Sequence, residues 1–325
     1  MKVLVLGGTG FIGARLVNKL REVGYHVRVI TRKENCTKAI NDESVEYIVC
    51  DILNHASVSE NYVNGCSVVF NCAGEIHNKE LMRAVHVESV RNIIDVCKKV
   101  AREKNQEIHW VQLSSVGAYG PPTGAANAER VVTEDTPQSP VGSYEITKTE
   151  ADELVKASAE KKIFTYSILR PSNVYGAEMP NNSLRQWAYL IKKNFFFYVG
   201  KPNAVSTYVH VDDVVGALLL CGFDQKARGE VFNISNDCSQ EYLVEAMAKA
   251  MNVSPPRLRL PEWVVRLISA LFKNVSGFPV TTSRINALVA RTQYPAVKLK
   301  KILGYEPKYD IAETVEEVIR GMERK

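Results

Sequence analysis

The sequence predicts an α/β fold, in which a doubly wound parallel sheet carries a smaller, irregular C-terminal lobe. Seven short apolar runs, rich in β-branched residues, recur along the chain, with helical patterns between several of them. This order is typical of a parallel sheet covered by helices on both faces. After Arg170 the pattern changes, because prolines and an asparagine-rich turn interrupt it, and this change predicts the second lobe.

The first apolar run, residues 3–6, leads directly into a glycine-rich turn. Gly7, Gly10 and Gly13 follow the spacing G-x-x-G-x-x-G, and an amphipathic helix is predicted over residues 14–23. The first glycine lets the chain bend sharply, the second lets the backbone approach a pyrophosphate, and the third lets helix and strand pack closely. Because the free N–H groups of the helix face the anion, the sequence predicts a Rossmann-type dinucleotide site.

The remaining strands are predicted from the same kind of apolar run. The full set of predicted strands is 3–6, 27–30, 47–49, 68–71, 110–113, 166–169 and 231–234. Asp51, Ala73–Gly74 and Ser114–Ser115 each follow one of these strands, at the carboxyl edge where open α/β sheets bind ligands. We therefore expect a dinucleotide-binding domain over 1–170, to which 205–235 returns, and a substrate lobe over 171–204 and 236–325.

Composition limits the classes of function. The net charge is +5, but lysines and arginines are scattered, which favours anionic small molecules over nucleic acid as partners. The seven cysteines include no C-x-x-C pair and no cluster with histidine, so we expect reduced thiols in a cytoplasmic protein and no metal site.

Two apolar segments have some features of a signal peptide or a membrane-spanning helix. The N-terminal run is followed by glycines and Arg15, which fit a buried strand better than a signal peptide. The run over 263–272 is interrupted by Arg266 and is too short to span a bilayer. We expect an amphipathic helix there and no stable membrane insertion, with peripheral membrane contact as the lesser alternative.

Tyr144 and Lys148 stand four residues apart in a predicted helix, so both side chains lie on one face. A tyrosine is a poor base at neutral pH unless a nearby cation stabilises its phenolate, and Lys148 can supply that charge. Ser115, at a strand end, would then hold a substrate oxygen while Tyr144 gives or takes its proton.

These features, in this order and at these separations, resemble the short-chain dehydrogenase/reductase superfamily in its extended branch. The resemblance runs essentially end to end. Residues 169–176, L-R-P-S-N-V-Y-G, are similar to the segment in which a proline lies against the nicotinamide, and residues 208–213 resemble the later V-x-V-x-D motif. Residues 298–307 resemble the closing segment of nucleotide-sugar epimerases and reductases.

The resemblance implies roles for individual residues. Tyr144 is the general acid/base, Lys148 binds the nicotinamide ribose and lowers the pKa of the tyrosine, and Ser115 orients the reacting carbonyl or alcohol. The expected cofactor-binding residues are Gly7, Thr9, Gly10, Phe11, Ile12, Gly13, Arg32, Asp51, Ile52, Ala73, Gly74, Ser114, Tyr144, Lys148, Pro171 and Val174. The expected substrate-binding residues are Glu75, Ser115, Tyr144, Asn173, Asn182, Arg284 and Arg291.

The end of the second predicted strand indicates which dinucleotide is bound. NAD-selective relatives place an acidic residue there, whereas this chain has Thr31, Arg32 and Lys33. Two cations would welcome a 2′-phosphate, so we expect a preference for NADP(H). NAD(H) remains the alternative, in which Arg32 stacks on adenine without discriminating.

The substrate is expected to be a nucleotide-diphosphate sugar of the 6-deoxy type, reduced at its C4 keto group. The alternatives are a nucleotide-sugar 4-epimerase, a steroid- or dihydroflavonol-like ketone reductase, and an NADP-binding redox sensor. The ketone reductases remain an alternative because the chain departs from the nucleotide-sugar enzymes at two places. Ser206-Thr207 stands where those enzymes usually have an arginine before the V-x-V-x-D segment, and His86 replaces an asparagine common in the helix after the fourth strand. By resemblance, the helices near 85–100 and 144–156 would form a homodimer contact.

Overall fold

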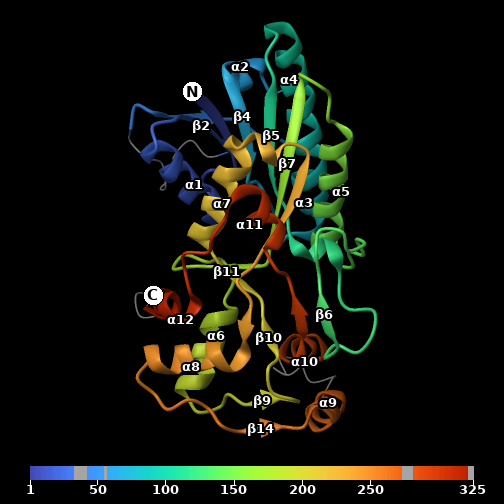
Figure 1. Cartoon of the computed structure of the whole chain (residues 1–325), viewed down its shortest axis with the longest axis vertical. Coiled ribbons are helices and arrows are strands. Elements are labelled where there is room, and N and C mark those ends of the chain that lie inside the picture. Colours follow the sequence, from blue (N-terminus) through green and yellow to red (C-terminus); the bar gives the residue numbers. More distant parts are fainter. Residues whose placement is uncertain (33–41, 55–56, 273–280, 321–325) are drawn as a thin grey trace.

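The computed structural model describes residues 1–32, 42–54, 57–272 and 281–320. Its centre is a seven-stranded parallel sheet in the order β12-β7-β5-β4-β1-β2-β3 (Figure 1). The bounds are β1 Lys2–Leu6, β2 His26–Thr31, β3 Val45–Val49, β4 Cys66–Asn71, β5 Ile108–Leu113, β7 Phe164–Pro171 and β12 Glu230–Ile234. Each predicted strand corresponds to one of these, so the doubly wound α/β prediction is confirmed.

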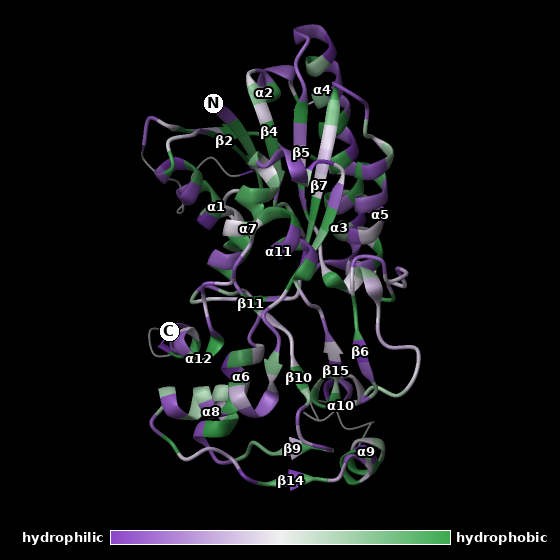
Figure 2. Cartoon of the chain, in the orientation of Figure 1, coloured by the Kyte–Doolittle hydropathy of each residue, from purple (hydrophilic) through white to green (hydrophobic). Residues whose placement is uncertain are grey.

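Helices cover both faces of the sheet because successive side chains of a strand point to opposite sides. Val3 and Val5 pack in the apolar cluster of α1 and α7, whereas Leu4 packs in the cluster of α2, α4 and α5. The helices on the two faces are α1 Phe11–Glu22, α7 Val211–Phe223 and α11 Val297–Leu303, and α2 Glu60–Val63, α4 Ser89–Lys104 and α5 Ser143–Ala157. Both faces of the sheet are therefore buried, and Figure 2 shows hydrophobic stretches in its strands, interrupted by pale and hydrophilic ones.

The strand order reverses beside β1, and this reversal positions the site. From β1 the chain builds outward through β2 and β3, and it then returns to place β4 on the other side of β1. The segments that leave the carboxyl ends of β1 and β4 must separate here, which opens the crevice where doubly wound sheets bind dinucleotides.

A second lobe lies beyond the carboxyl edge of the sheet (Figure 1). Its main core joins Tyr175, Leu184, Leu243 and Val315, which come from separate parts of the chain. Its elements are β8 Asn173–Tyr175, α6 Ser183–Lys192, β9 Tyr198–Val199, β10 Val205–Ser206, β11 Tyr208–His210, β13 Cys238–Ser239, α8 Gln240–Ala250, β14 Arg259–Leu260, α9 Glu262–Leu271, α10 Thr282–Val289, β15 Arg291–Gln293 and α12 Ile311–Arg320.

Short elements complete the chain between β4 and α7. They are α3 Lys79–Arg83, the π-helical turn η2 Ala84–Glu88, the 3-10 turn η3 Val116–Tyr119 and β6 Glu129–Val131, followed after α7 by the 3-10 turn η4 Gln225–Ala227. No helix among the described residues is long and apolar enough to cross a bilayer.

A segment of the predicted substrate lobe, helix α11, packs on the sheet, although the predicted domain division does not assign it there. Leu299, Leu303 and Tyr305 belong to the apolar cluster that α1 and α7 form on the sheet, and α11 packs against β12. The proposed substrate lobe, 236–325, thus contains a segment that covers the dinucleotide-binding half. The short, lysine-rich α11 carries too weak an apolar pattern to predict this return.

Candidate active site

The glycine turn after β1 is packed too tightly for side chains. Gly7 has φ +71°, and a Cβ there would lie 2.6 Å from the backbone nitrogen of Ala73. A Cβ on Gly13 would overlap the carbonyl oxygen of Gly7. The turn therefore brings β1, the start of α1 and the residues after β4 into backbone contact.

The start of α1 is suited to an anion. Gly10 is the N-cap residue and offers no side-chain acceptor, and the first turn carries no acidic residue. The first N–H groups of a helix have no partner within the helix, and the helix dipole favours negative charge there. These features fit the pyrophosphate of a dinucleotide cofactor.

A cavity of about 240 Å³ begins at this turn. Among the expected cofactor residues, those that line it are Gly7, Thr9, Gly10, Arg32, Ile52, Ala73 and Gly74. Glu75, which was assigned to the substrate, also lines it. Sequence reasoning missed Ile30, Cys50, Leu53, Cys72 and Val85, although the first four lie at or just after strand ends and could have been found by that position.

Arg32 lies at the cavity with its side chain exposed, directly after Thr31 at the end of β2. This is the place where a dinucleotide's adenosine ribose lies in doubly wound folds. Lys33, the other cation on which the cofactor preference was based, lies outside the described residues.

Several expected cofactor residues do not line this cavity. Asp51 accepts a hydrogen bond from the backbone N–H of Leu53 (3.1 Å), and Phe11 packs against the lobe core near Gly176. The others outside the lining are Ile12, Gly13, Ser114, Tyr144, Lys148, Pro171 and Val174.

Lys148 lies buried on α5, directly beyond the cavity. Its Nζ donates to the carbonyl oxygens of Leu113 (2.9 Å) and Ala73 (3.4 Å). A Cβ on Gly74, which lines the cavity, would lie 3.6 Å from this Nζ. Burial lowers the pKa of Lys148 to about 8, against the opposite effect of the Asp152 carboxylate. The Lys148 side chain therefore lies between the cavity and the helix that carries Tyr144.

Tyr144 stands one helical turn before Lys148 and is partly buried. Burial raises its pKa to about 12, and the charges of Glu145 and Asp152 act in the same direction. We expected Lys148 to lower the pKa of Tyr144, but in the chain by itself this pKa is raised. At neutral pH the phenol holds its proton, which is the state required of a proton donor.

His86, on the π-helical turn η2, supports Tyr144. The two rings meet edge to face with centroids 5.4 Å apart. Nε2 of His86 accepts the backbone N–H of Glu75 (3.0 Å), and Nδ1 lies 2.7 Å from Oγ1 of Thr147. Burial lowers the pKa of His86 to about 3, so the ring is neutral with its proton on Nδ1. The histidine is a satisfied core residue that borders the site.

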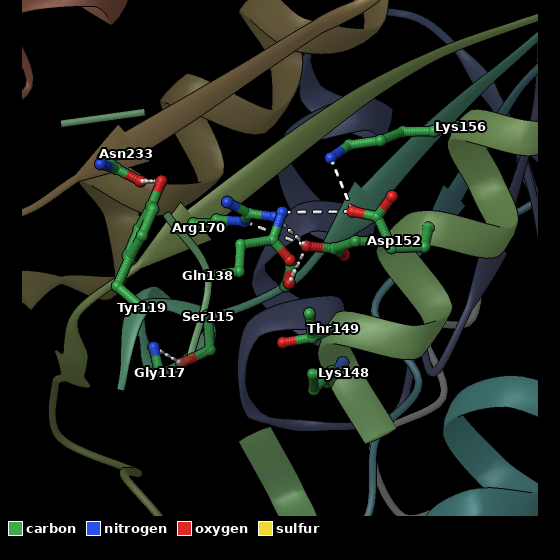
Figure 3. A network of polar contacts seen from close by, with 12 residues as sticks. Ser115, Gly117, Tyr119, Gln138, Lys148, Thr149, Asp152, Lys156, Arg170 and Asn233 are labelled. Carbon is green, nitrogen blue, oxygen red and sulfur yellow. Dashed lines mark hydrogen bonds and ion pairs between the residues drawn. The ribbon is translucent and has the colours of Figure 1, made fainter. Parts of the chain in front are cut away.

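Two adjacent serines follow β5 and face different partners. Ser115 caps η3, because its Oγ accepts the backbone N–H of Gly117 (3.1 Å), as Figure 3 shows. Ser114 is buried, and its Oγ donates to Oδ2 of Asp152 (2.8 Å). The structure thus places Ser115 at the start of a tight turn and ties Ser114 to α5.

Asp152 belongs to a buried charge pair that the sequence did not predict. Nε and Nη2 of Arg170 donate to its Oδ2 at 3.0 and 2.9 Å (Figure 3). The guanidinium also lies over the ring of Tyr119, 5.1 Å from the centroid, and the hydroxyl of Tyr119 donates to Asn233. Tyr144, Lys148 and Asp152 follow one another at single turns along α5, so this network lies directly behind the lysine.

The expected substrate residues are mostly engaged within the protein. Nδ2 of Asn173 donates to the carbonyl oxygen of Thr207 (3.0 Å), and Asn182 accepts from Arg185 (3.2 Å). Arg291 donates to the backbone carbonyls of Pro202 and Asn203. Arg284 is exposed on α10.

The side chains of the V-x-V-x-D segment make structural contacts. His210 caps α7 by accepting the backbone N–H of Asp212 (3.2 Å), and it stacks on Tyr309 with centroids 4.4 Å apart. Asp213 accepts two backbone N–H groups of 308–309.

Comparisons with known proteins agree with this architecture. The sequence model of the NAD dependent epimerase/dehydratase family matches residues 3–235. The chain is 26% identical to a mouse sterol-4-alpha-carboxylate 3-dehydrogenase, decarboxylating, covering 98% of this chain and 90% of that protein. It is 24% identical to a UDP-glucose 4-epimerase of Vibrio cholerae, covering 96% and 92%. Among solved structures, MoeE5 in complex with UDP-glucose and NAD superposes with a TM-score of 0.73 at 21% identity, covering 100% and 99%, which indicates a shared fold.

Proposed function

The chain belongs to the NAD dependent epimerase/dehydratase family, and from this membership we propose that it is an NADP(H)-preferring ketoreductase of a nucleotide-linked sugar. The observation that carries the proposal is the junction between cavity and helix α5. Gly74 lines the dinucleotide cavity, and the ammonium of Lys148 lies against it. A cofactor seated in the cavity would therefore end beside Lys148 and Tyr144.

The state of Tyr144 favours reduction. The reduced cofactor, when bound, would supply the hydride for the carbonyl carbon of the substrate. Tyr144 donates its phenolic proton to the carbonyl oxygen, which becomes a hydroxyl, and Ser115 orients that oxygen. A pKa of about 12 keeps the proton on Tyr144 at neutral pH, ready for this step. Lys148, still largely charged below pH 8, compensates the phenolate that remains.

The preference for NADP(H) rests on Arg32. Its exposed guanidinium borders the cavity where β2 ends, and Thr31 beside it brings no negative charge. A guanidinium binds a 2′-phosphate by charge-assisted hydrogen bonds, whereas a carboxylate at this place would repel it.

The proposed substrate is a nucleotide-linked, 6-deoxy hexose with a keto group at C4. Similarity to the UDP-glucose 4-epimerase over 96% of the chain supports this class. A 4-epimerase is the variant of the same chemistry in which the cofactor is regenerated and no net reduction occurs. Net reduction accords better with a preference for NADP(H), because NADPH is the form that cells use as a reductant.

A second candidate is a ketone reductase for an apolar, steroid-like substrate. Asn173 and Arg291, two groups expected to bind a sugar diphosphate, are engaged with backbone carbonyls instead. Similarity to the sterol-4-alpha-carboxylate 3-dehydrogenase covers 98% of the chain. The two candidates share Ser115, Tyr144 and Lys148 and differ in what the lobe recognises.

The experiment follows NADPH consumption by the purified protein. We expect NADPH to be consumed with at least one of the UDP-, dTDP- or GDP-linked 4-keto-6-deoxy hexoses. A parallel series uses steroid 3-ketones dispersed in detergent. Consumption with the steroids alone would favour the second candidate, and absence of NADPH oxidation in both series would contradict a reductase.

The Tyr144→Phe variant separates an enzyme from a protein that only senses NADP. Removing the phenolic proton should lower kcat by about 10²- to 10⁴-fold, while NADPH binding is retained. Binding is measured from the quenching of protein fluorescence. Unchanged turnover in the variant would remove Tyr144 from the proposed mechanism.

We also infer the surroundings in which the protein works. The six cysteines in the described part of the chain are free thiols, which accords with a reducing, cytoplasmic compartment. A homodimer formed through α4 and α5 is part of the same proposal.

A further inference from the structure

Helix α9 lies at the end of the lobe far from the sheet (Figure 1), and it presents an apolar face to solvent. Trp263, Leu267 and Leu271 recur at intervals of four residues, and their side chains are 69%, 54% and 71% exposed. Ile268 adds to this face, and Figure 2 shows hydrophobic colour on α9 at this end of the molecule. A surface helix normally turns its apolar side inward.

The opposite side of α9 is already packed. Val265 and Ser269 are buried, and Val265 belongs to the apolar cluster that includes Ile285 of α10 and Val199 of β9. The two charged residues of the helix pair with each other, since Nε of Arg266 donates to Glu262 at 2.8 Å. The apolar residues that face outward are therefore a second apolar face, in addition to the one that holds the helix in place.

Neighbouring segments extend this apolar face. Strand β9 pairs with β14, so the chain before β9 lies beside the chain before β14. Phe195, ahead of β9, is 69% exposed, and Leu258, ahead of β14, is 60% exposed. We call Phe195, Leu258, Trp263, Leu267, Ile268 and Leu271 the lobe tip. Large apolar side chains exposed together at one end of a lobe are typical of an interaction site in a soluble protein.

The lobe tip is bordered by positive charge. Lys192, Lys193, Lys201 and Arg257 are exposed in the same segments. Glu262 is the only acidic residue in the sequence between 246 and 305, and there is none between 179 and 211. Among the described residues, the lobe tip thus has a cationic border, and two acids beside it, Glu262 and Glu241, already pair with Arg266 and Arg259.

We propose that the lobe tip docks on the surface of an anionic phospholipid bilayer, with α9 lying in the plane of the interface. Aromatic and aliphatic side chains would enter the boundary between headgroups and acyl chains, and the bordering cations would contact lipid phosphates. Two copies of this chain would not pair here, because their cationic borders would oppose each other and the neighbouring acids, Glu241 and Glu262, are already paired within the chain.

This docking requires no membrane-spanning helix. Helix α9 has ten residues, about half of what a span needs, and none of the described helices is a candidate span. The sheet and the dinucleotide cavity would remain in water, and the substrate lobe would face the membrane. The inference holds whichever substrate class the lobe binds.

The test is co-sedimentation of the full chain with vesicles of phosphatidylglycerol, with phosphatidylcholine vesicles as the neutral comparison. We expect binding to phosphatidylglycerol that weakens as salt is raised, little binding to phosphatidylcholine, and a blue shift of tryptophan emission from Trp263. The Trp263→Ser/Leu271→Ser variant should weaken binding by at least about tenfold, since each side chain loses its transfer from water. The Lys192→Glu/Lys193→Glu variant should lose the preference for phosphatidylglycerol.

Val23→Ser/Val297→Ser is the matched control. Both valines are exposed, at 50% and 66%, and lie on the sheet half, so vesicle binding should be unchanged. NADPH binding, measured in solution for each variant, shows independently that the protein is folded. No sedimentation of the native chain, equal binding by the Trp263→Ser/Leu271→Ser variant, or a lipid-free change of oligomeric state in that variant would each overturn the proposal.

Discussion

The carboxylate of Asp152 lies one helical turn beyond Lys148 and sets the charge around it. The carboxylate raises the pKa of Lys148, while burial lowers it to about 8. Arg170 and Ser114 both bind Oδ2 of Asp152, and Oδ1 is buried without a hydrogen-bond partner. The charge on the lysine therefore depends on a group that does not reach the cofactor cavity.

This dependence predicts how cofactor binding responds to pH. Lys148 loses its proton as the pH rises through about 8, so NADPH affinity should fall above that pH. In Asp152→Asn the missing negative charge lowers the pKa of Lys148 further, and the midpoint of the fall should move to lower pH. Fluorescence titrations across pH measure both midpoints. Tyr144→Phe is the control, because a group with a pKa of about 12 does not titrate in this range.

The same substitution should also destabilise the fold. Asp152→Asn leaves the guanidinium of Arg170 buried without its anion, which costs about 3–5 kcal/mol of unfolding free energy. The neighbouring Glu153→Gln is the matched control, since its exposed pair with Lys156 contributes little, within about 0.5 kcal/mol. Urea denaturation measures both. Equal stability of the two variants would refute the importance of the buried pair.

The proposed preference for NADP(H) depends on a single side chain, that of Arg32. Arg32→Ala should weaken NADPH binding by about tenfold or more, because it removes charge-assisted hydrogen bonds to the 2′-phosphate. NADH binding serves as the internal control and should change little. Parallel loss of affinity for both dinucleotides would mean that Arg32 stacks on adenine without discriminating.

Single residues differ in how far the sequence could predict them. Tyr144 and Lys148 are close in the sequence, so helical spacing alone predicts that they share a face. Asp152 and Arg170 lie on different elements, and His86 reaches Tyr144 from a π-helical turn. Contacts of this kind depend on how α4, α5 and β7 pack, and no local pattern predicts that packing.

At the level of elements, the crossing of β1 and α1 depends on glycine. Gly13→Ala would drive a methyl group into the carbonyl oxygen of Gly7, so the start of α1 must move away from the cavity. We expect a loss of stability of about 1–3 kcal/mol and strongly weakened NADPH binding. Thermal unfolding and a binding titration measure these effects.

Gly216→Ala, in the middle of α7, is the matched control. A Cβ there meets no atom within 4 Å, so this variant should be as stable as the native chain or up to about 1 kcal/mol more stable. Similar destabilisation by both substitutions would show that close packing at Gly13 is not the cause.

The sequence predicted long, uniformly buried strands well and short strands poorly. Strands buried on both faces give continuous apolar runs, and all seven were visible in the sequence. The lobe is built from pairs of two or three residues, such as β10 with β13 and β15 with β6, which are too short to show a period. The return of α11 to the sheet was missed for the same reason.

At the scale of the molecule, the outer face of α5 is the proposed homodimer contact. A hollow of about 460 Å³ lies there, bordered by Arg83, Ile146 and Leu154, and Ile146 is 38% exposed. Ile146→Arg should convert the dimer to a monomer, because a desolvated guanidinium would replace an apolar contact. Sedimentation velocity measures the change. Val297→Arg on α11 should leave the assembly intact, and a native monomer would contradict the proposal.

The order in which the two halves are completed follows from how α12 closes the lobe. Val315 lies in the lobe core, Thr314 bonds the hydroxyl of Tyr175 (2.7 Å) and Glu317 bonds His210 (2.7 Å). A chain emerging from the ribosome has all seven strands of the sheet by Ile234 and the covering helix α11 by Leu303, before α12 is made. During synthesis the nascent protein would thus complete the sheet half first and the second lobe last; with the proposed division of roles, the cofactor could be taken up before any substrate is recognised.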